Sequence, residues 1–232
     1  MKLIIENFRK FISEDITVGI SKEIDDETLD KVFEWAGVED KSSVKHLGSA
    51  SMGSAYRISS RDFGDVVLKI TNDSSEAHST TNLVKSGQEH PNVYKVFKVA
   101  RIPTSGRPRY AIITELLNQP DPAIQYAMGS LFGLVRLGEK GLHRWRGYGN
   151  NPTLDQKLDV IAQDAKSQKN FQPEKIKEYI DKIASGLTFL NELGIFFDDL
   201  KASNILQRGD EPVIIDLGRI GLPKYMPIDT ID

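Results

Sequence analysis

The sequence predicts an α+β fold in two lobes, with a five-stranded antiparallel sheet followed by a mostly helical part. Two changes in the spacing of apolar residues support this prediction. Up to residue 40, and again after residue 118, apolar side chains recur every three or four positions, as on one face of a helix. Between residues 44 and 117 they alternate or form short bursts rich in β-branched and aromatic residues, which is typical of strands. We therefore expect three parts: a helical extension at 1–40, a sheet-bearing lobe at 41–117 and a helical lobe at 118–232.

The helical extension shows the pattern of an amphipathic helix. The apolar residues Leu29, Val32, Phe33 and Ala36 recur at steps of three and four, acidic residues precede them, and Gly37 follows. We expect two short helices in this part, packed against the rest of the protein.

Five apolar bursts, separated by Gly, Asn, Asp and Pro, predict the strands of the sheet. They are VKHLG (44–48), SAYRIS (54–59), VVLKI (66–70), VYKVFKVA (93–100) and YAIITELL (110–117). A helix at about 74–85 interrupts them.

The helical lobe contains three helix-like stretches and one hairpin. The helices are expected at 121–138, 153–168 and 172–194, and the first two form a helical insert at about 121–170. Two short apolar runs, 196–206 and 211–220, joined by Gln-Arg-Gly-Asp, predict the hairpin.

Composition excludes several classes of protein. The 232 residues include 30 basic and 33 acidic side chains, so a net charge of −3 gives the chain no overall attraction to nucleic acid or anionic membranes. The basic and aromatic stretch at 140–149 fits a substrate-docking or solvated loop better than a nucleic-acid site, because the charge around it is balanced. The absence of cysteine rules out disulfides and thiolate chemistry. With no signal peptide and no apolar run of about 18 residues, we expect a cytoplasmic protein without a membrane segment.

Two features of the predicted sheet are candidates for anion binding. Gly48 and Gly53, between the first two strands, permit a tight turn whose amides could face phosphate oxygens, although a plain surface hairpin explains the spacing more simply. Lys69 lies within an apolar strand, so it either faces solvent or points inward, where it would need an anion.

The stretch FFDDLKASNIL (196–206) raises the question of chemistry most directly. Asp199, Lys201 and Asn204 lie on one arm of the predicted hairpin, and Asp216 lies on the other. Each residue alone is a common turn former or helix cap. Together they offer hard oxygen ligands of the kind that suits Mg²⁺ in the company of phosphate oxygens.

The order of these motifs resembles the eukaryotic-type protein kinase fold over residues 44 to about 220. The family's glycine-rich loop, strand lysine, catalytic loop and Asp-Phe-Gly motif are matched by GSASMG, VLK, FDDLKASN and DLG. The catalytic loop is the most specific of these matches. The short chain, and the Ser-Ala-Tyr after the glycine loop, also resemble the compact kinases encoded by some lytic bacteriophages.

The resemblance implies a role for each group in binding ATP and Mg²⁺. Asp199 would orient the attacking hydroxyl, Lys201 would offset charge on the transferred phosphoryl group, and Asn204 and Asp216 would bind Mg²⁺. Lys69 would bind the α- and β-phosphates, with a glutamate of the next helix as its partner. That glutamate is Glu76 or, as a second choice, Glu89, and Thr114 would border the adenine site. The implied nucleotide-binding set is Gly48, Ser49, Met52, Gly53, Lys69, Glu76, Glu115 and Leu117, where Glu115 and Leu117 act through their backbone.

Some residues depart from the family pattern. Phe197 and Asp198 stand where histidine and arginine are usual, which predicts activity independent of activation-loop phosphorylation. Ala50 replaces the central glycine of the loop. Sixteen residues follow Asp216, so we expect a truncated C-terminal lobe whose substrate platform comes from the helical insert, the helical extension or a partner protein.

The sequence thus predicts a protein serine/threonine kinase that transfers the γ-phosphoryl group of MgATP to protein hydroxyls. Lys201 favours proteins over small-molecule substrates, because small-molecule kinases that resemble this fold usually lack this lysine. Two alternatives stay open: a pseudokinase that acts as an ATP-binding scaffold through a partner, and an enzyme that transfers nucleotidyl groups to protein.

Overall fold

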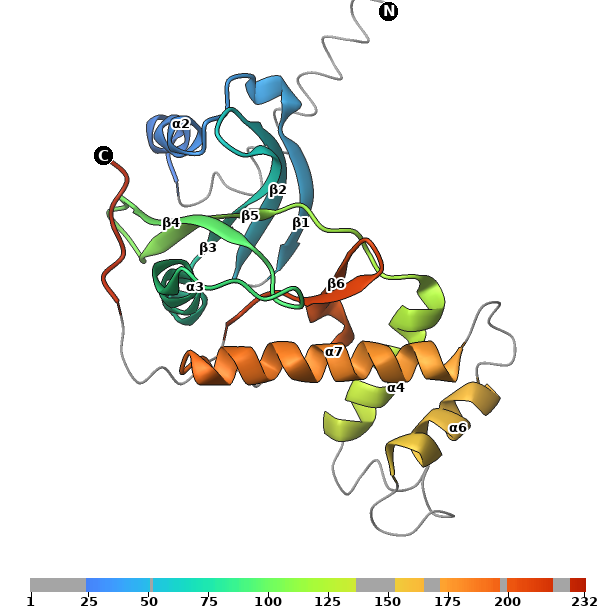
Figure 1. The fold of residues 1–232 in the computed structure, drawn as a ribbon. Coiled ribbons are helices and arrows are strands. Elements are labelled where there is room, and N and C mark those ends of the chain that lie inside the picture. Colours follow the sequence, from blue (N-terminus) through green and yellow to red (C-terminus); the bar gives the residue numbers. More distant parts are fainter. Residues whose placement is uncertain (1–23, 51, 137–152, 165–171, 197–199, 219–225) are drawn as a thin grey trace, which may run out of the picture.

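The computed structural model describes residues 24–50, 52–136, 153–164, 172–196, 200–218 and 226–232 (Figure 1). Within these residues the fold is α+β, with one five-stranded antiparallel sheet, a two-stranded hairpin and five α-helices. The α+β class and the five-stranded sheet predicted from the sequence are therefore confirmed. None of the described helices combines the length and the apolar character needed to cross a membrane.

The sheet is built from consecutive antiparallel pairs, except that β5 lies between β3 and β4. Its spatial order is β1-β2-β3-β5-β4, which leaves β1 and β4 at the edges. The strands are β1 (Lys45–Ala50), β2 (Gly53–Ser60), β3 (Gly64–Thr71), β4 (Val96–Ile102) and β5 (Arg109–Glu115). Buried and less buried residues alternate along β2, as the period of a half-buried strand requires.

One face of the sheet packs against α2 (Asp26–Trp35). Asp25 caps this helix by accepting a 2.7 Å hydrogen bond from the backbone N–H of Thr28. Val32 and Phe33 are buried in one apolar cluster with side chains of β2, β3 and β5. The short turn η1 (Lys41–Ser43) then leads into β1. Residues 1–23 lie outside the described residues, and so does the other helix expected in the extension.

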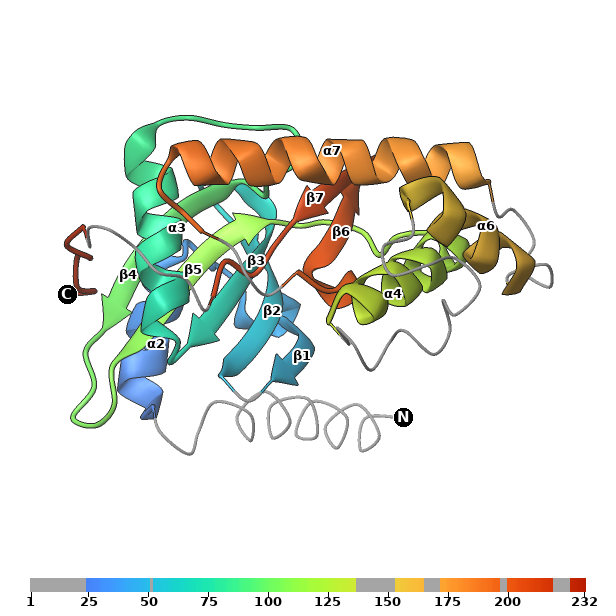
Figure 2. The ribbon, with the colours of Figure 1, turned by 90° about the horizontal axis from the view of Figure 1, so that it is seen from below.

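Helix α3 (Ser74–Ser86) joins β3 to β4 and lies beside β4 and β5 (Figure 2). Asp73 caps it, since its Oδ1 accepts hydrogen bonds from the N–H groups of Ser75 (2.9 Å) and Glu76 (3.2 Å). Gly87 ends the helix in the left-handed conformation, with φ of 65°. The cap fixes the first turn of α3, where Glu76 is buried.

The second half of the protein packs around the long helix α7 (Pro173–Glu192). Helices α4 (Pro122–Arg136) and α6 (Leu154–Asp164) lie beside α7 near one of its ends, and α7 itself runs along the hairpin (Figure 2). The turn η4 (Ala202–Asn204) leads into this hairpin of β6 (Ile205–Arg208) and β7 (Glu211–Ile214). The apolar face predicted for α7 is confirmed by its buried residues Ile176, Tyr179, Ile183 and Leu190.

Residues 92–94 connect the two halves. Residues 93–95 were expected in the fourth strand, but β4 begins only at Val96, because residues 92–94 pair with β7 instead. The N–H of Tyr94 donates to the carbonyl of Ile214 (3.0 Å), and the N–H of Ile214 donates to that of Asn92 (2.9 Å). These bonds attach the hairpin to the segment that precedes β4. Ile214, which makes both of them, lies two residues before Asp216.

Candidate functional site

Three charged side chains from distant parts of the chain meet at Lys69. The ammonium of Lys69, on β3, lies 2.6 Å from Oε1 of Glu76 and 3.0 Å from Oδ1 of Asp216. Its side chain is 27% exposed and that of Glu76 only 2%. Lys69 thus points toward α3, while its neighbours Leu68 and Ile70 are buried in the cluster that includes α2. Of the two orientations open for a strand lysine, the structure has the inward one, with anionic partners.

The second-choice partner of Lys69 is engaged elsewhere. Glu89 lies 2.7 Å from the ammonium of Lys95, at the far end of α3 from Glu76. The structure therefore brings Glu76, and not Glu89, to Lys69.

Burial makes the charge state of this cluster sensitive to pH. Desolvation raises the pKa of Glu76 to about 7, against the opposing effect of Lys69. For Lys69, desolvation acts to lower the pKa, but Glu76 and Asp216 together outweigh it and raise the pKa above its usual value. The lysine therefore stays cationic at neutral pH between two acidic groups, one of which, Glu76, keeps its proton to a higher pH than an ordinary glutamate.

Asp216 has an unusual backbone conformation. Its φ of 62° is the only positive value among the described non-glycine residues. Aspartate adopts the left-handed conformation more readily than most residues with a side chain, and non-glycine residues in this conformation are concentrated at functional sites. Asp216 is the second residue after β7, and its carboxylate lies 3.0 Å from the ammonium of Lys69.

The register of the hairpin places Asn204 opposite Ile215, one residue before Asp216. Ile205 pairs with Ile214, so the residue before β6 lies opposite the residue after β7. The N–H of Ile215 accordingly donates to the carbonyl of Asn204 over 2.9 Å, and Asn204 is buried. No group of three or more His, Cys, Asp or Glu side chains within the described residues is arranged to hold a metal ion. An ion bound between Asn204 and Asp216 would therefore take further oxygens from phosphate or water, as Mg²⁺ usually does.

The catalytic-loop residues are described only in part. Lys201 directly precedes η4 and is half-buried. Asp199, with Phe197 and Asp198, lies outside the described residues, as does the basic stretch at 140–149.

The turn between β1 and β2 shows different roles for its two glycines. Gly48 lies within β1, is exposed, and has open space where a Cβ would be. At Gly53, a Cβ would lie 2.1 Å from the carbonyl oxygen of Ile70, so the close approach of β3 requires glycine there. The Ser49 and Ser54 hydroxyls are 2.7 Å apart, and Met52 is exposed at the turn. This turn leads into β2, on which Ala55 pairs with Lys69.

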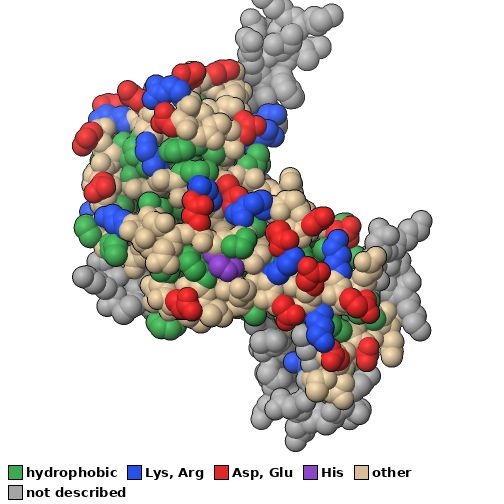
Figure 3. All heavy atoms as spheres, in the orientation of Figure 1, with side chains coloured by type: hydrophobic (Ala, Val, Ile, Leu, Met, Phe, Trp, Pro, Cys, Tyr) green, Lys and Arg blue, Asp and Glu red, His purple; other side chains and the backbone are tan. Residues whose placement is uncertain are grey.

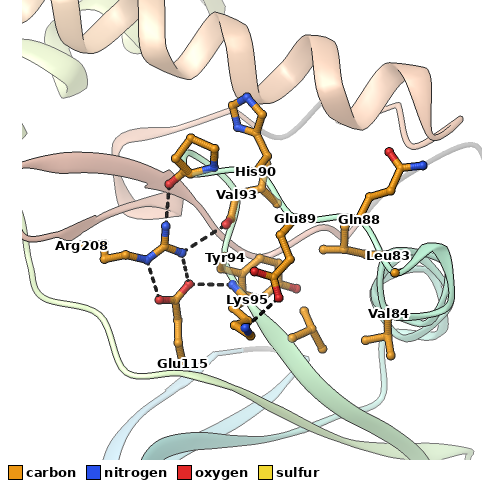
Figure 4. A pocket seen from close by; sticks show the side chains of 13 residues that line it. Leu83, Val84, Gln88, Glu89, His90, Val93, Tyr94, Lys95, Glu115 and Arg208 are labelled. Carbon is orange, nitrogen blue, oxygen red and sulfur yellow. Dashed lines mark hydrogen bonds and ion pairs between the residues drawn. The ribbon is translucent and has the colours of Figure 1, made fainter.

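Glu115, the last residue of β5, directs its side chain toward the hairpin and the start of β4. Glu115 bonds to Arg208 of β6 and to the N–H of Lys95, which leaves its backbone as the part that a base could contact (Figure 4). Thr114 is buried near the end of β5. Leu117 is partly buried and packs against the apolar cluster of the helical half.

Two residues of this region, Asp73 and Arg208, were not expected from the sequence to contribute to it. Asp73 caps α3. A Cβ added to Gly218 would lie 2.7 Å from Oδ2 of Asp73. Arg208, in the hairpin, reaches Glu115. A capping motif is detectable only for Asp73, because Asp precedes a helical pattern; its contact with Gly218 depends on tertiary structure.

No protein-family model matches the chain, and a search of curated proteins finds no significant match. Functional reasoning therefore depends on the residues and their geometry. On the face shown in Figure 3, acidic and basic side chains are interspersed, without a large patch of one sign.

Proposed function

We propose that the chain is a two-lobed enzyme of the eukaryotic-type protein kinase fold that transfers the γ-phosphoryl group of MgATP to serine or threonine hydroxyls of proteins. The observation that carries this proposal is the meeting of Lys69, Glu76 and Asp216, with Lys69 and Asp216 separated by 147 positions in the sequence. A cation held by two carboxylates, one of them an aspartate in the left-handed conformation, is an arrangement suited to a triphosphate and its divalent ion.

Each residue of the site has a role that its chemistry supports. Lys69 binds the α- and β-phosphates, and Glu76 holds the lysine in place. Asn204 and Asp216 offer the oxygens that would hold Mg²⁺, which neutralises phosphate charge when bound. Lys201 offsets the charge that develops on the transferred group.

In the proposed reaction the hydroxyl oxygen of the substrate attacks the γ-phosphorus. The bond between the γ-phosphorus and the β-γ bridging oxygen breaks, ADP leaves, and Asp199 accepts the hydroxyl proton. Phosphoryl transfer of this kind depends on positioning and charge stabilisation, so loss of one such group should lower turnover by orders of magnitude with little effect on the fold.

The test is phosphoryl transfer from γ-labelled ATP with Mg²⁺ to a generic protein substrate or to the chain itself. We expect the native chain to transfer label, and Asp199→Asn and Asp216→Asn to reduce transfer at least 100-fold. Asp210→Asn, at an exposed turn of the hairpin, is the matched control and should retain activity.

Other outcomes would favour the alternatives. Label that arrives only from the α-position of ATP would indicate nucleotidyl transfer. Binding of MgATP without any transfer, over a range of metals and protein substrates, would indicate a scaffold. A native chain that fails to bind MgATP at millimolar concentration would refute all three.

A further inference from the structure

The guanidinium of Arg208, on β6, contacts Glu115 at the end of β5 and the segment 91–93 before β4 (Figure 4). Its Nε donates to Oε2 of Glu115 over 2.8 Å, and its Nη2 donates to Oε1 of the same carboxylate. Its Nη1 donates to the carbonyl of Pro91 over 2.7 Å, and its Nη2 reaches that of Val93 at 3.4 Å. Arginine is suited to this position because its planar fork can bind a carboxylate with two hydrogen bonds and still reach two carbonyls.

Strand β6 also holds the other end of the same segment. The residue before Arg208 is Gln207, whose N–H donates to the carbonyl of Asn118 over 2.8 Å and whose carbonyl accepts from the N–H of Asn118 over 3.0 Å. Two consecutive residues of β6 thus fix the segment 115–118 at both ends, one through its side chain and one through its backbone.

The Glu115 side chain is 16% exposed and borders a hollow on this side. A hollow of about 480 Å³ lies against Arg208 and Glu115, between the end of α3, the 88–91 turn and the start of β4. The carboxylate of Glu115 is oriented there by its hydrogen bonds to Arg208 and to the N–H of Lys95 (2.6 Å).

Strand β6 begins directly after Asn204, so this four-residue strand connects a proposed Mg²⁺ ligand to the segment whose backbone would contact adenine. We propose that Arg208 is a positioning residue for the nucleotide base: it fixes Glu115, and thereby the backbone of 115–117, at the distance from the metal site that one ATP molecule requires. This inference rests on the proposed function, since it assumes that ATP binds between these two groups.

The contribution of Arg208 to global stability should be small. The Arg208 side chain is 40% exposed and that of Glu115 is 16% exposed, so solvent screens the pair from the side of the arginine, and Glu115 keeps the hydrogen bond from the N–H of Lys95 when Arg208 is replaced. A loss of base positioning can therefore be separated from a loss of fold.

The experiment compares two ligands in the presence of Mg²⁺: ATP, which has a base, and inorganic tripolyphosphate, which lacks one. We expect Arg208→Met to bind ATP about tenfold more weakly, roughly the effect of one hydrogen bond, and to bind tripolyphosphate as the native chain does. Arg208→Lys should show most of this loss, because an ammonium cannot form the bidentate pair. Arg57→Met, which removes the ion pair of a similarly exposed arginine with Asp65 between β2 and β3, is the control and should change neither affinity.

If Arg208→Met fails to fold, Glu115→Gln serves as the second variant, since it keeps the size and backbone of residue 115 and weakens the pair. Unchanged or tighter ATP binding by the Arg208 variants, or an equal loss for both ligands, would overturn the positioning role while leaving the proposed function in place. A native chain that binds neither ligand would refute the proposed function, and the positioning role with it.

Discussion

At the scale of single residues, Lys69 and Glu76 show how burial couples charge to stability. Burial puts the pKa of Glu76 at about 7, above the 4.5 of an unperturbed glutamate. The folded chain therefore holds a proton that the unfolded chain releases between these two values. Stability that is fully present below about pH 4.5 should be lost as the pH rises toward 7.

Glu76→Gln should remove this dependence. The native chain, without nucleotide, should lose up to about 3 kcal/mol of unfolding free energy from this group between pH 4.5 and 7.5, and the variant should lack this loss. Urea unfolding at several pH values measures the difference. Glu34→Gln, at an exposed position of α2, is the control and should follow the native profile. Parallel profiles for Glu76→Gln and the native chain would show that Glu76 is ionised in the folded state throughout.

The contact between Gly218 and Asp73 makes a second prediction at this scale. Gly218→Ala places a methyl group 2.7 Å from Oδ2 of Asp73, whose other oxygen caps α3, so the carboxylate cannot move away without weakening the cap. We expect a loss of about 1–2 kcal/mol in unfolding free energy. Gly106→Ala, which meets no atom within 4 Å, is the control.

A double-mutant cycle assigns this cost to Asp73. Asp73→Ala alone should cost about 1 kcal/mol through the lost cap. Combined with Gly218→Ala, it should cost clearly less than the sum of the two single changes, because the clash is gone. Additive costs would place the strain elsewhere.

At the scale of elements, the two glycines around the β1–β2 turn differ in what they permit. Gly53→Ala would drive a methyl group into the backbone of β3, 2.1 Å from the Ile70 oxygen, and the two strands would have to separate. We expect a loss of about 2–3 kcal/mol for Gly53→Ala and a change within about 0.5 kcal/mol for Gly48→Ala. Chemical unfolding followed by circular dichroism tests both. Equal stabilities would contradict the β2–β3 spacing described above.

The elements themselves were largely predictable, because their signals are local. The helix expected at 74–85 is observed as Ser74–Ser86, and the one expected at 172–194 as Pro173–Glu192. Helical periodicity and capping residues suffice for such assignments. The strand expected at 93–100 starts late, since residues 92–94 pair with β7, a contact across about 120 positions that no local pattern reveals.

The candidate site was predictable as a set of residues but not as an arrangement. Alternation along β3 leaves the direction of Lys69 open, and only the contacts with Glu76 and Asp216 decide it. The ion pair of Arg208 with Glu115 could not be predicted, because an arginine beside a hairpin turn is common and Glu115 is 93 positions away.

At the scale of the whole molecule, residues 229–231 return to the sheet from which the chain departed at β5. The N–H of Arg101 donates to the carbonyl of Asp229 (2.8 Å), and the N–H of Ile231 donates to the carbonyl of Arg101 (2.9 Å). These bonds extend along the outer edge of β4 (Figure 1). The edge of the sheet is thereby covered at Arg101, which limits its pairing with other chains.

Ile231 anchors this return, and its loss should affect the sheet half of the molecule. The side chain is 5% exposed and belongs to the cluster that contains α2 and the sheet. Ile231→Ala should cost about 2–3 kcal/mol of unfolding free energy, through lost burial and the cavity that remains. It should also increase hydrogen exchange at the amide of Arg101, because the segment that covers this amide is released. Thr230→Ala, at an exposed neighbouring position, should change neither quantity. If Ile231→Ala matched Thr230→Ala in both measurements, the return of residues 229–231 to β4 would not contribute to the stability of the folded chain.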